Sequence, residues 1–134
     1  YPEHVVLGSD TTVVLGNRIL GKPGTPERAA EMLRMLSGKT HHVVTGVALA
    51  KGTHVVSFQT ETEVTFYPLT EAQIQNYVAT REPLDKAGGY GIQGRGALLV
   101  EKINGDFYSV VGLPVAAVSR ALRAFSGAES QKGI

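Results

Sequence analysis

The sequence contains no cysteine, no long apolar run and no excess of charge of one sign. The lack of cysteine excludes disulfides and thiolate chemistry and is compatible with a reducing cytoplasm, where we expect the protein to reside. No apolar run approaches the roughly 20 residues that a membrane-spanning helix needs, so we expect no membrane partner. The 13 basic and 12 acidic residues are interspersed and give a formal charge of +1, which argues against a nucleic-acid binder.

The apolar content is sufficient for the core of one domain, since 43% of the 134 residues are hydrophobic. The chain begins with Tyr1 rather than Met, almost directly in a segment that we interpret as a strand. We take this as a first indication that a preceding segment is missing.

The first strands are predicted from β-branched runs. "HVVLG" at 4–8 is typical of a buried strand that ends at Gly8 and is followed by a polar turn. "VVLGNRIL" at 13–20 predicts two short strands joined at Gly16–Asn17, a pair that tolerates positive φ in a tight hairpin.

Three helices are predicted from capping residues and apolar spacing. Thr25 is the expected N-cap of a helix from Pro26 to Ser37. Thr70, followed three residues later by Gln73, forms a capping-box pattern that opens a second helix. "VAAVSRALRAF" predicts a last amphipathic helix, so we assign one domain to residues 1–125 and a flexible tail to 126–134.

Two further hairpins are predicted, one turning at Lys51–Gly52 and the other at Asn104–Gly105. Strands that alternate with helices indicate an α/β fold class with a mixed twisted sheet and flanking helices.

Asp10 is the first candidate for chemistry, because it follows the predicted opening strand in "GSDTT". Open α/β sheets place ligands at such strand ends, where a carboxylate can act as a general base or hold Mg²⁺. An Asx turn that only ends the strand is the structural alternative.

Lys22 is the second candidate, because "GKPG" holds it on a constrained loop where an ammonium can contact phosphate. A surface lysine without a ligand is the structural alternative.

The third candidate is "DKAGGYGIQGRG" at 85–96, which has five glycines among twelve residues. Ordering so much glycine costs conformational entropy, and a bound ligand is one way to offset that cost. Asp85 and Lys86 precede glycines that allow a ligand to approach the backbone, and the Gln93 amide can bond the edge of a pyrimidine base. Tyr90 is a candidate for stacking on the base, whereas packing is the expected role of Phe107 and Tyr108. The four histidines lack the spacing of a zinc site.

These blocks together resemble the Maf family, which is named for a link to septum formation. The resemblance covers residues 5 to about 125 in order and is carried by the following blocks: "GSDTTVV", "ILGKP", "MLRMLSGKTHHVVTGVAL", "TEVTFYPL" and "EPLDKAGGYGIQGRGALLVEKINGDFYSVVGLP". It implies a fold related to the inosine triphosphate pyrophosphatases, with a cleft between two lobes. It also implies hydrolysis of a nucleoside triphosphate, with a divalent cation (Mg²⁺ or Mn²⁺), to the monophosphate and pyrophosphate.

The resemblance also assigns roles to single residues. Asp10 matches the family's acidic proton acceptor, with Ser9 in place of the usual Ala, and Lys22 matches a lysine that contacts phosphate. Thr11 and Gln93 match positions that distinguish subgroups, and "GIQG" is similar to the branch that acts on dTTP and UTP. Asp85 and Lys86 are expected near the triphosphate or its metal.

The family's N-terminal S-x-S-P-R-R segment, which supplies serine and arginine contacts to phosphate, has no counterpart here. The chain is then a fragment or a natural short form, and we expect an exposed edge along 5–7 that favours a homodimer. Two functions stay open. One is a pyrophosphatase for dTTP, UTP or their modified forms, and the other is a non-catalytic nucleotide sensor that regulates septum formation.

Overall fold

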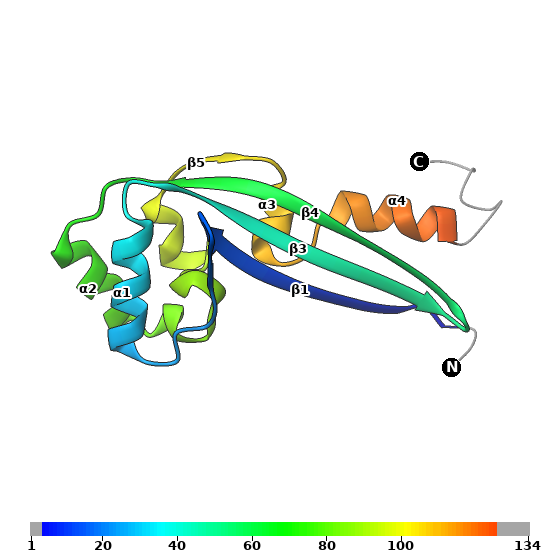
Figure 1. Cartoon of the computed structure of the whole chain (residues 1–134), viewed down its shortest axis with the longest axis horizontal. Helices are drawn as coiled ribbons and strands as arrows, with labels where there is room; N and C mark the ends of the chain where they lie inside the picture. Colours follow the sequence, from blue (N-terminus) through cyan, green and yellow to red (C-terminus); the bar gives the residue numbers. More distant parts are fainter. Residues whose placement is uncertain (1–3, 126–134) are drawn as a thin grey trace.

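A single five-stranded sheet organises the chain in the computed structural model, which describes residues 4–125 (Figure 1). The strand order is β2-β1-β3-β4-β5, and all four pairings are antiparallel. The strands are β1 (Val6–Leu15), β2 (Arg18–Leu20), β3 (Thr40–Lys51), β4 (His54–Phe66) and β5 (Val100–Asn104). The expected α/β class with flanking helices is confirmed. A mixed sheet was expected, but the described strands contain no parallel pair. Tight turns join β1 to β2 and β3 to β4 and account for two of the antiparallel pairs.

Four α-helices and three short 3₁₀ segments complete the described chain. The helices are α1 (Pro26–Leu36), α2 (Glu71–Ala79), α3 (Phe107–Val111) and α4 (Val115–Phe125). The 3₁₀ segments are η1 (Glu82–Asp85), η2 (Ala87–Gly89) and η3 (Gly94–Leu99). None of the described helices is long and apolar enough to cross a membrane.

The predicted caps of α1 and α2 and the hairpin turns at Gly16–Asn17 and Lys51–Gly52 are confirmed. The Thr25 hydroxyl accepts a hydrogen bond from the Arg28 amide at 3.2 Å, and Pro26 occupies the first helical turn. Thr70 and Gln73 form the reciprocal capping box of α2. Gly16 and Gly52 have φ values of +59° and +62° in their turns, which glycine adopts without strain. Local chemistry therefore accounts for these element ends.

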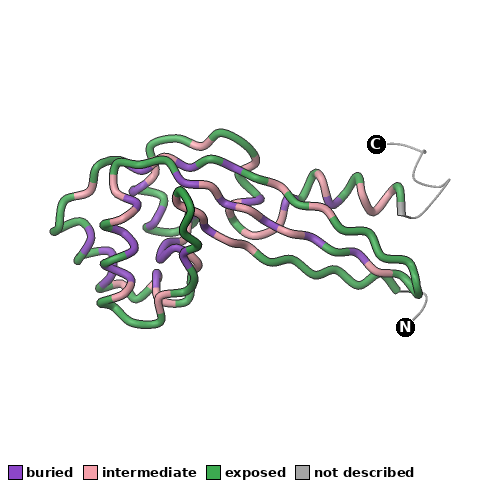
Figure 2. Tube along the Cα trace, viewed as in Figure 1, coloured by how far each residue is buried: buried purple, intermediate pink, exposed green. Residues whose placement is uncertain are grey.

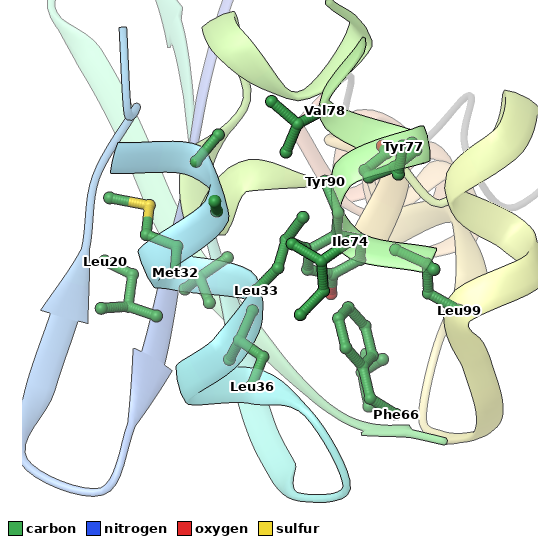
Figure 3. Packing of buried hydrophobic residues seen from close by; sticks show 14 of the residues in the cluster. Leu20, Met32, Leu33, Leu36, Phe66, Ile74, Tyr77, Val78, Tyr90 and Leu99 are labelled. Atoms are coloured by element: carbon green, nitrogen blue, oxygen red, sulfur yellow. The ribbon is translucent and has the colours of Figure 1, made fainter. Parts of the chain in front are cut away.

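The hydrophobic core lies at one end of the sheet. Helices α1 and α2 cover this end, while β1, β3 and β4 extend away from them as a long arm, and α3 packs against β3 and β4 (Figure 1). Phe66, Leu33 and Ile74 are among the buried residues that pack between the sheet and these two helices (Figure 3). Toward its tip the arm is largely exposed (Figure 2), and 63% of Val6 and 65% of Val55 are accessible.

The opening strand was predicted wrongly to end at Gly8. β1 continues from Val6 to Leu15 because β3 pairs with it from Val6 opposite Ala50 to Val14 opposite His42. The partner strand supplies backbone hydrogen bonds that override the turn preference of "GSDTT". Asp10 consequently lies in the middle of a strand, opposite Gly46, rather than at its carboxyl end.

The hairpin predicted at Asn104–Gly105 is also wrong, because β5 leads into α3. The Asp106 amide donates to the Thr62 hydroxyl at 3.1 Å, which holds the start of α3 against β4. The Ser109 hydroxyl accepts from Thr60 at 2.8 Å and donates to the Asp106 carboxylate at 2.9 Å. These hydroxyl groups favour a helix across the sheet over a strand beside it. The predicted tail at 126–134 lies outside the described residues.

Candidate active site

A pocket of about 470 Å³ forms where β1, β3, α3 and the glycine-rich segment meet. All six predicted site residues line it: Asp10, Thr11, Lys22, Asp85, Lys86 and Gln93. Asp10 and Thr11 come from β1, Lys22 from the loop after β2, Asp85 from η1, and Lys86 and Gln93 from the connections that follow it. The volume lies within the usual range for small-molecule sites.

Asp10 borders this pocket with an exposed side chain. It also borders a second, more open hollow of about 580 Å³ over the small residues Gly8, Gly46 and Ala48. β2 pairs with β1 only at Val13–Leu15, so within the described chain the preceding part of β1 is an open edge. The Asp10 carboxylate is therefore accessible to solvent and to a ligand.

Thr11 faces the other side of the strand from Asp10, as successive strand residues do, and the pocket borders both residues at the open edge that β1 has within the described chain. The Thr45 hydroxyl donates its hydrogen to the Ser109 carbonyl at 2.7 Å, so the 3.1 Å contact between Thr11 and Thr45 must be donated by Thr11. Thr11 thus joins the polar network that attaches α3, which forms a wall of the pocket through Val110 and Val111.

Lys22 lies on a loop that two backbone hydrogen bonds attach to the glycine-rich region. The Gly24 amide donates to the Leu84 carbonyl at 2.9 Å, and the Gly88 amide donates to the Gly21 carbonyl at 3.1 Å. The lysine side chain is exposed, yet its backbone is fixed on both sides. This arrangement directs an ammonium to the pocket and suits the binding of an anionic ligand.

Asp85 and Lys86 lie on the pocket wall, with 3.7 Å between the Lys86 Nζ and the Asp85 Oδ1. Both side chains are exposed, so this ion pair is weak and either partner can turn toward a charged ligand. Gln93 is exposed in the same wall, directly before η3.

Tyr90, which was predicted to stack on the base, lines the pocket but is almost entirely buried in the core. Its ring is only 5% exposed and packs against Phe66 with ring centroids 4.8 Å apart. Its hydroxyl lies 2.6 Å from the His41 Nε2, and burial raises the Tyr90 pKa above its ordinary value. Conversely, Phe107 and Tyr108, which were expected to pack inside, are exposed on α3.

Sequence reasoning missed Glu82, which also lines the pocket. Its carboxylate accepts a hydrogen bond from the Tyr77 hydroxyl and two more from the backbone of the glycine-rich segment. The only sequence signal was its place in "EPLDKAGGYGIQG", just before the residues that were selected. Among the described residues, no three His, Asp or Glu side chains are grouped so that they could hold a metal ion by themselves.

Comparison with known proteins gives one family. The family model described as Maf-like protein matches residues 1–125. A dTTP/UTP pyrophosphatase of Bacillus cereus (strain B4264) is 57% identical over 123 residues, which are 92% of this chain and 64% of that protein. A dTTP/UTP pyrophosphatase of Bacillus cytotoxicus is 56% identical over 130 residues, which are 97% of this chain and 68% of that protein. The chain thus spans about two thirds of the length of the curated relatives that it matches. From the family match and these identities, the chain belongs to the Maf family.

Proposed function

We propose that this chain carries the nucleotide pocket of a cytoplasmic nucleoside triphosphate pyrophosphatase that converts dTTP or UTP to the monophosphate and pyrophosphate. The observation that carries the proposal is the convergence of all six candidate residues on one pocket. The relatives with 56–57% identity that are named dTTP/UTP pyrophosphatase support the same substrate class.

Each of the pocket residues has a separate role in the proposed reaction. Water adds across the α–β phosphoanhydride bond, Asp10 accepts the proton that the water loses, and the bridging oxygen leaves with the β and γ phosphates as pyrophosphate. Lys22 and Lys86 neutralise phosphate charge. Gln93 faces the base and offers an acceptor and two donors on one amide.

The side chains present fit a divalent cation that is bound jointly with the substrate. Mg²⁺ usually binds through one or two carboxylates together with substrate phosphates, rather than through a cage of protein ligands. Asp10 and Asp85 are exposed carboxylates on the pocket wall and would hold the ion in this way. Bound Mg²⁺ or Mn²⁺ would withdraw charge from the triphosphate.

The test of this function is pyrophosphate release from dTTP, UTP, CTP and ATP with Mg²⁺ or Mn²⁺. We expect release from dTTP and UTP that depends on the metal and exceeds release from CTP and ATP. Nucleotide binding without any pyrophosphate release would contradict the enzymatic proposal and favour the nucleotide sensor.

Gln93→Ala is expected to narrow the preference for UTP over CTP. The Gln93 oxygen and amide group match the N3–H and a carbonyl of uracil, whereas cytosine presents an amino group and a bare N3. An unpaired polar group costs about 1 to 3 kcal/mol, which corresponds to roughly tenfold to hundredfold discrimination. Comparison of kcat/KM for UTP and CTP measures the effect.

Lys22→Ala is the matched control for this experiment, because a phosphate contact is common to all the substrates. It should slow UTP and CTP hydrolysis alike and leave their ratio unchanged. If Gln93→Ala also lowers both rates equally, the amide supports the loop and does not read the base.

A homodimer or larger assembly is a further part of the proposal. Within residues 4–125, β1 has an open edge before its pairing with β2, and Val6 and Leu7 are exposed on it. Such edges pair readily with another chain. We expect a sedimenting mass of at least twice that of one chain, and Val6→Lys should lower it while Leu98→Lys, on a remote exposed residue, should not. A monomer at high concentration would contradict this expectation.

A further inference from the structure

The glycine-rich segment closes around a carboxylate of the protein itself. The Glu82 Oε2 accepts hydrogen bonds from the Tyr77 hydroxyl at 2.5 Å and from the Gly96 amide at 3.1 Å. The Oε1 accepts from the Arg95 amide at 3.3 Å. The Tyr77 hydroxyl in turn accepts from the Gly91 amide at 3.0 Å. Glu82 and Tyr77 therefore bind both ends of the segment 91–96.

Two of the glycines are required by this closure. A Cβ atom at Gly94 would overlap the Glu82 carboxylate, and Gly94 also has a φ of +69°. A Cβ atom at Gly96 would overlap the Gly91 carbonyl oxygen. Glycine is thus required at position 94 by the contact with Glu82 and at position 96 by the close approach of the segment to Gly91. The entropy cost of ordering them is offset by an internal anion before any ligand arrives.

The negative charge of Glu82 suits three donors. A carboxylate accepts on both oxygens, whereas the amide of glutamine would turn an NH₂ group toward at least one donor. Burial, and then the hydrogen bond to Glu82, raise the Tyr77 pKa, so the phenol stays protonated and can donate. Charge-assisted hydrogen bonds of this kind are about twice as strong as neutral ones.

The segment that Glu82 holds carries the base-facing side of the pocket. Gly91, Gln93 and Gly94 all line the pocket. The Lys86 side chain lies over Gly91, where a Cβ atom would come within 3.0 Å of the Lys86 Cε. Displacement of the segment would therefore move the Gln93 amide and the Lys86 chain together.

We propose that Glu82, together with Tyr77, is a positioning residue that orders the segment 91–96 before the nucleotide binds, so that Gln93 and Lys86 are already placed for the base and the phosphates. This proposal rests on the proposed function of the pocket. Glu82 also borders the pocket, so direct action on the substrate is the competing role. Tyr77 is outside the pocket lining, and its substitution separates the two roles.

The first measurement is amide hydrogen exchange of the chain without nucleotide, which does not depend on activity. Glu82→Gln and Tyr77→Phe should each accelerate exchange at Gly91 and Gly96 by at least about tenfold, the effect of losing one charge-assisted hydrogen bond. Glu101→Gln and Tyr67→Phe, which change exposed groups of the same kinds, should leave these amides unchanged. The melting temperature of each variant shows whether the loss of protection is local.

The second measurement is the ratio of UTP to CTP affinity, by equilibrium binding, and of kcat/KM for the same nucleotides. Both Glu82→Gln and Tyr77→Phe should reduce the two ratios by about threefold to tenfold. They should also raise KM more than they lower kcat, because a less ordered loop weakens nucleotide binding. In Glu82→Asp, both ratios should lie between those of Glu82→Gln and those of the natural chain.

Unchanged exchange in both variants would overturn the proposal. A large loss of kcat in Glu82→Gln with a normal Tyr77→Phe would also overturn it, because that pattern means direct action of Glu82. If the natural chain binds UTP in preference to CTP but releases no pyrophosphate, the enzymatic proposal fails while the exchange and affinity measurements still decide the role of Glu82. If it binds neither nucleotide, both proposals fail.

Discussion

Asp10→Asn is expected to reduce turnover at least about a hundredfold, which is the usual scale for the loss of a general base. Asparagine keeps the size of the side chain and removes the charge, so it can neither accept the proton of water nor bind a divalent cation well. Asp10 is exposed in the middle of β1, opposite Gly46, where the substitution removes no packing. The measurement is pyrophosphate release from dTTP and UTP at saturating metal.

The stability of the Asp10→Asn chain should be unchanged, and its melting temperature checks this. Glu63→Gln, which removes another exposed carboxylate from the same sheet, is the matched control and should retain full activity. Turnover in Asp10→Asn within a few fold of the natural chain would transfer the catalytic role to another carboxylate of the pocket, of which Asp85 is the first to test.

Acid should destabilise the protein through His41, a buried imidazole at the centre of the core. His41 is 0% exposed, its Nε2 lies 2.6 Å from the Tyr90 hydroxyl, and its ring contacts those of Phe66 and Tyr90 edge to face. Its Nδ1 is buried without a hydrogen-bond partner among the described residues. Burial, and to a lesser degree the adjacent His42, lower the His41 pKa from 6.5 to about 4.

The sign of the effect follows from where the proton binds. Between pH 6.5 and about 4 the unfolded chain takes up a proton at His41 and the folded chain does not, so the free energy of unfolding falls as the pH falls through this window. The loss amounts to about 3 kcal/mol and levels off below the folded pKa. Above pH 6.5 the protein keeps this whole contribution to its free energy of unfolding. Urea unfolding at a series of pH values measures the slope.

His41→Gln should flatten this slope, because glutamine does not titrate and can still accept from Tyr90. His54→Gln, at an exposed histidine of the arm, should keep it. A hydrogen bond from Arg34 lowers the Glu71 pKa from 4.5 to about 2, so the stability that Glu71 contributes is lost between these values, and the His41 slope is therefore compared between pH 6.5 and 4.5. An equal slope in His41→Gln and the natural chain would contradict the assignment to His41.

The sequence predicted those parts of the fold that adjacent residues decide. Thr25 before Pro26, Thr70 with Gln73, and Gly16–Asn17 each contain the donor, acceptor or backbone freedom that their local structure needs. β1 and α3 were predicted wrongly because distant partners decide them. β3 continues β1 through its polar residues, and hydroxyl groups of β3 and β4 hold the segment after Gly105 as a helix.

In the candidate site, too, some residues could be selected from the sequence and others depend on distant contacts. The six predicted residues meet in one pocket; local patterns selected five of them, and only Thr11 was added by the resemblance of whole blocks to the family. Glu82 could not be selected in this way, because its importance depends on a loop that returns to it from 14 residues further along the chain. From the sequence, the five glycines were explained by a bound ligand. In the structure, contacts within the protein, with Glu82 and with Gly91, explain why positions 94 and 96 are glycine.

The four residues of η1 act as a common frame for both ends of the pocket. The Leu84 carbonyl holds the loop that bears Lys22, through a 2.9 Å bond from the Gly24 amide, and the Glu82 carboxylate holds the segment that bears Gln93. The spacing between the proposed phosphate end and the proposed base end of the pocket is then set by one short turn. Under the proposed function, we expect a triphosphate to contact both ends of the pocket, and we expect the monophosphate product, which lacks the β and γ phosphates, to bind more weakly.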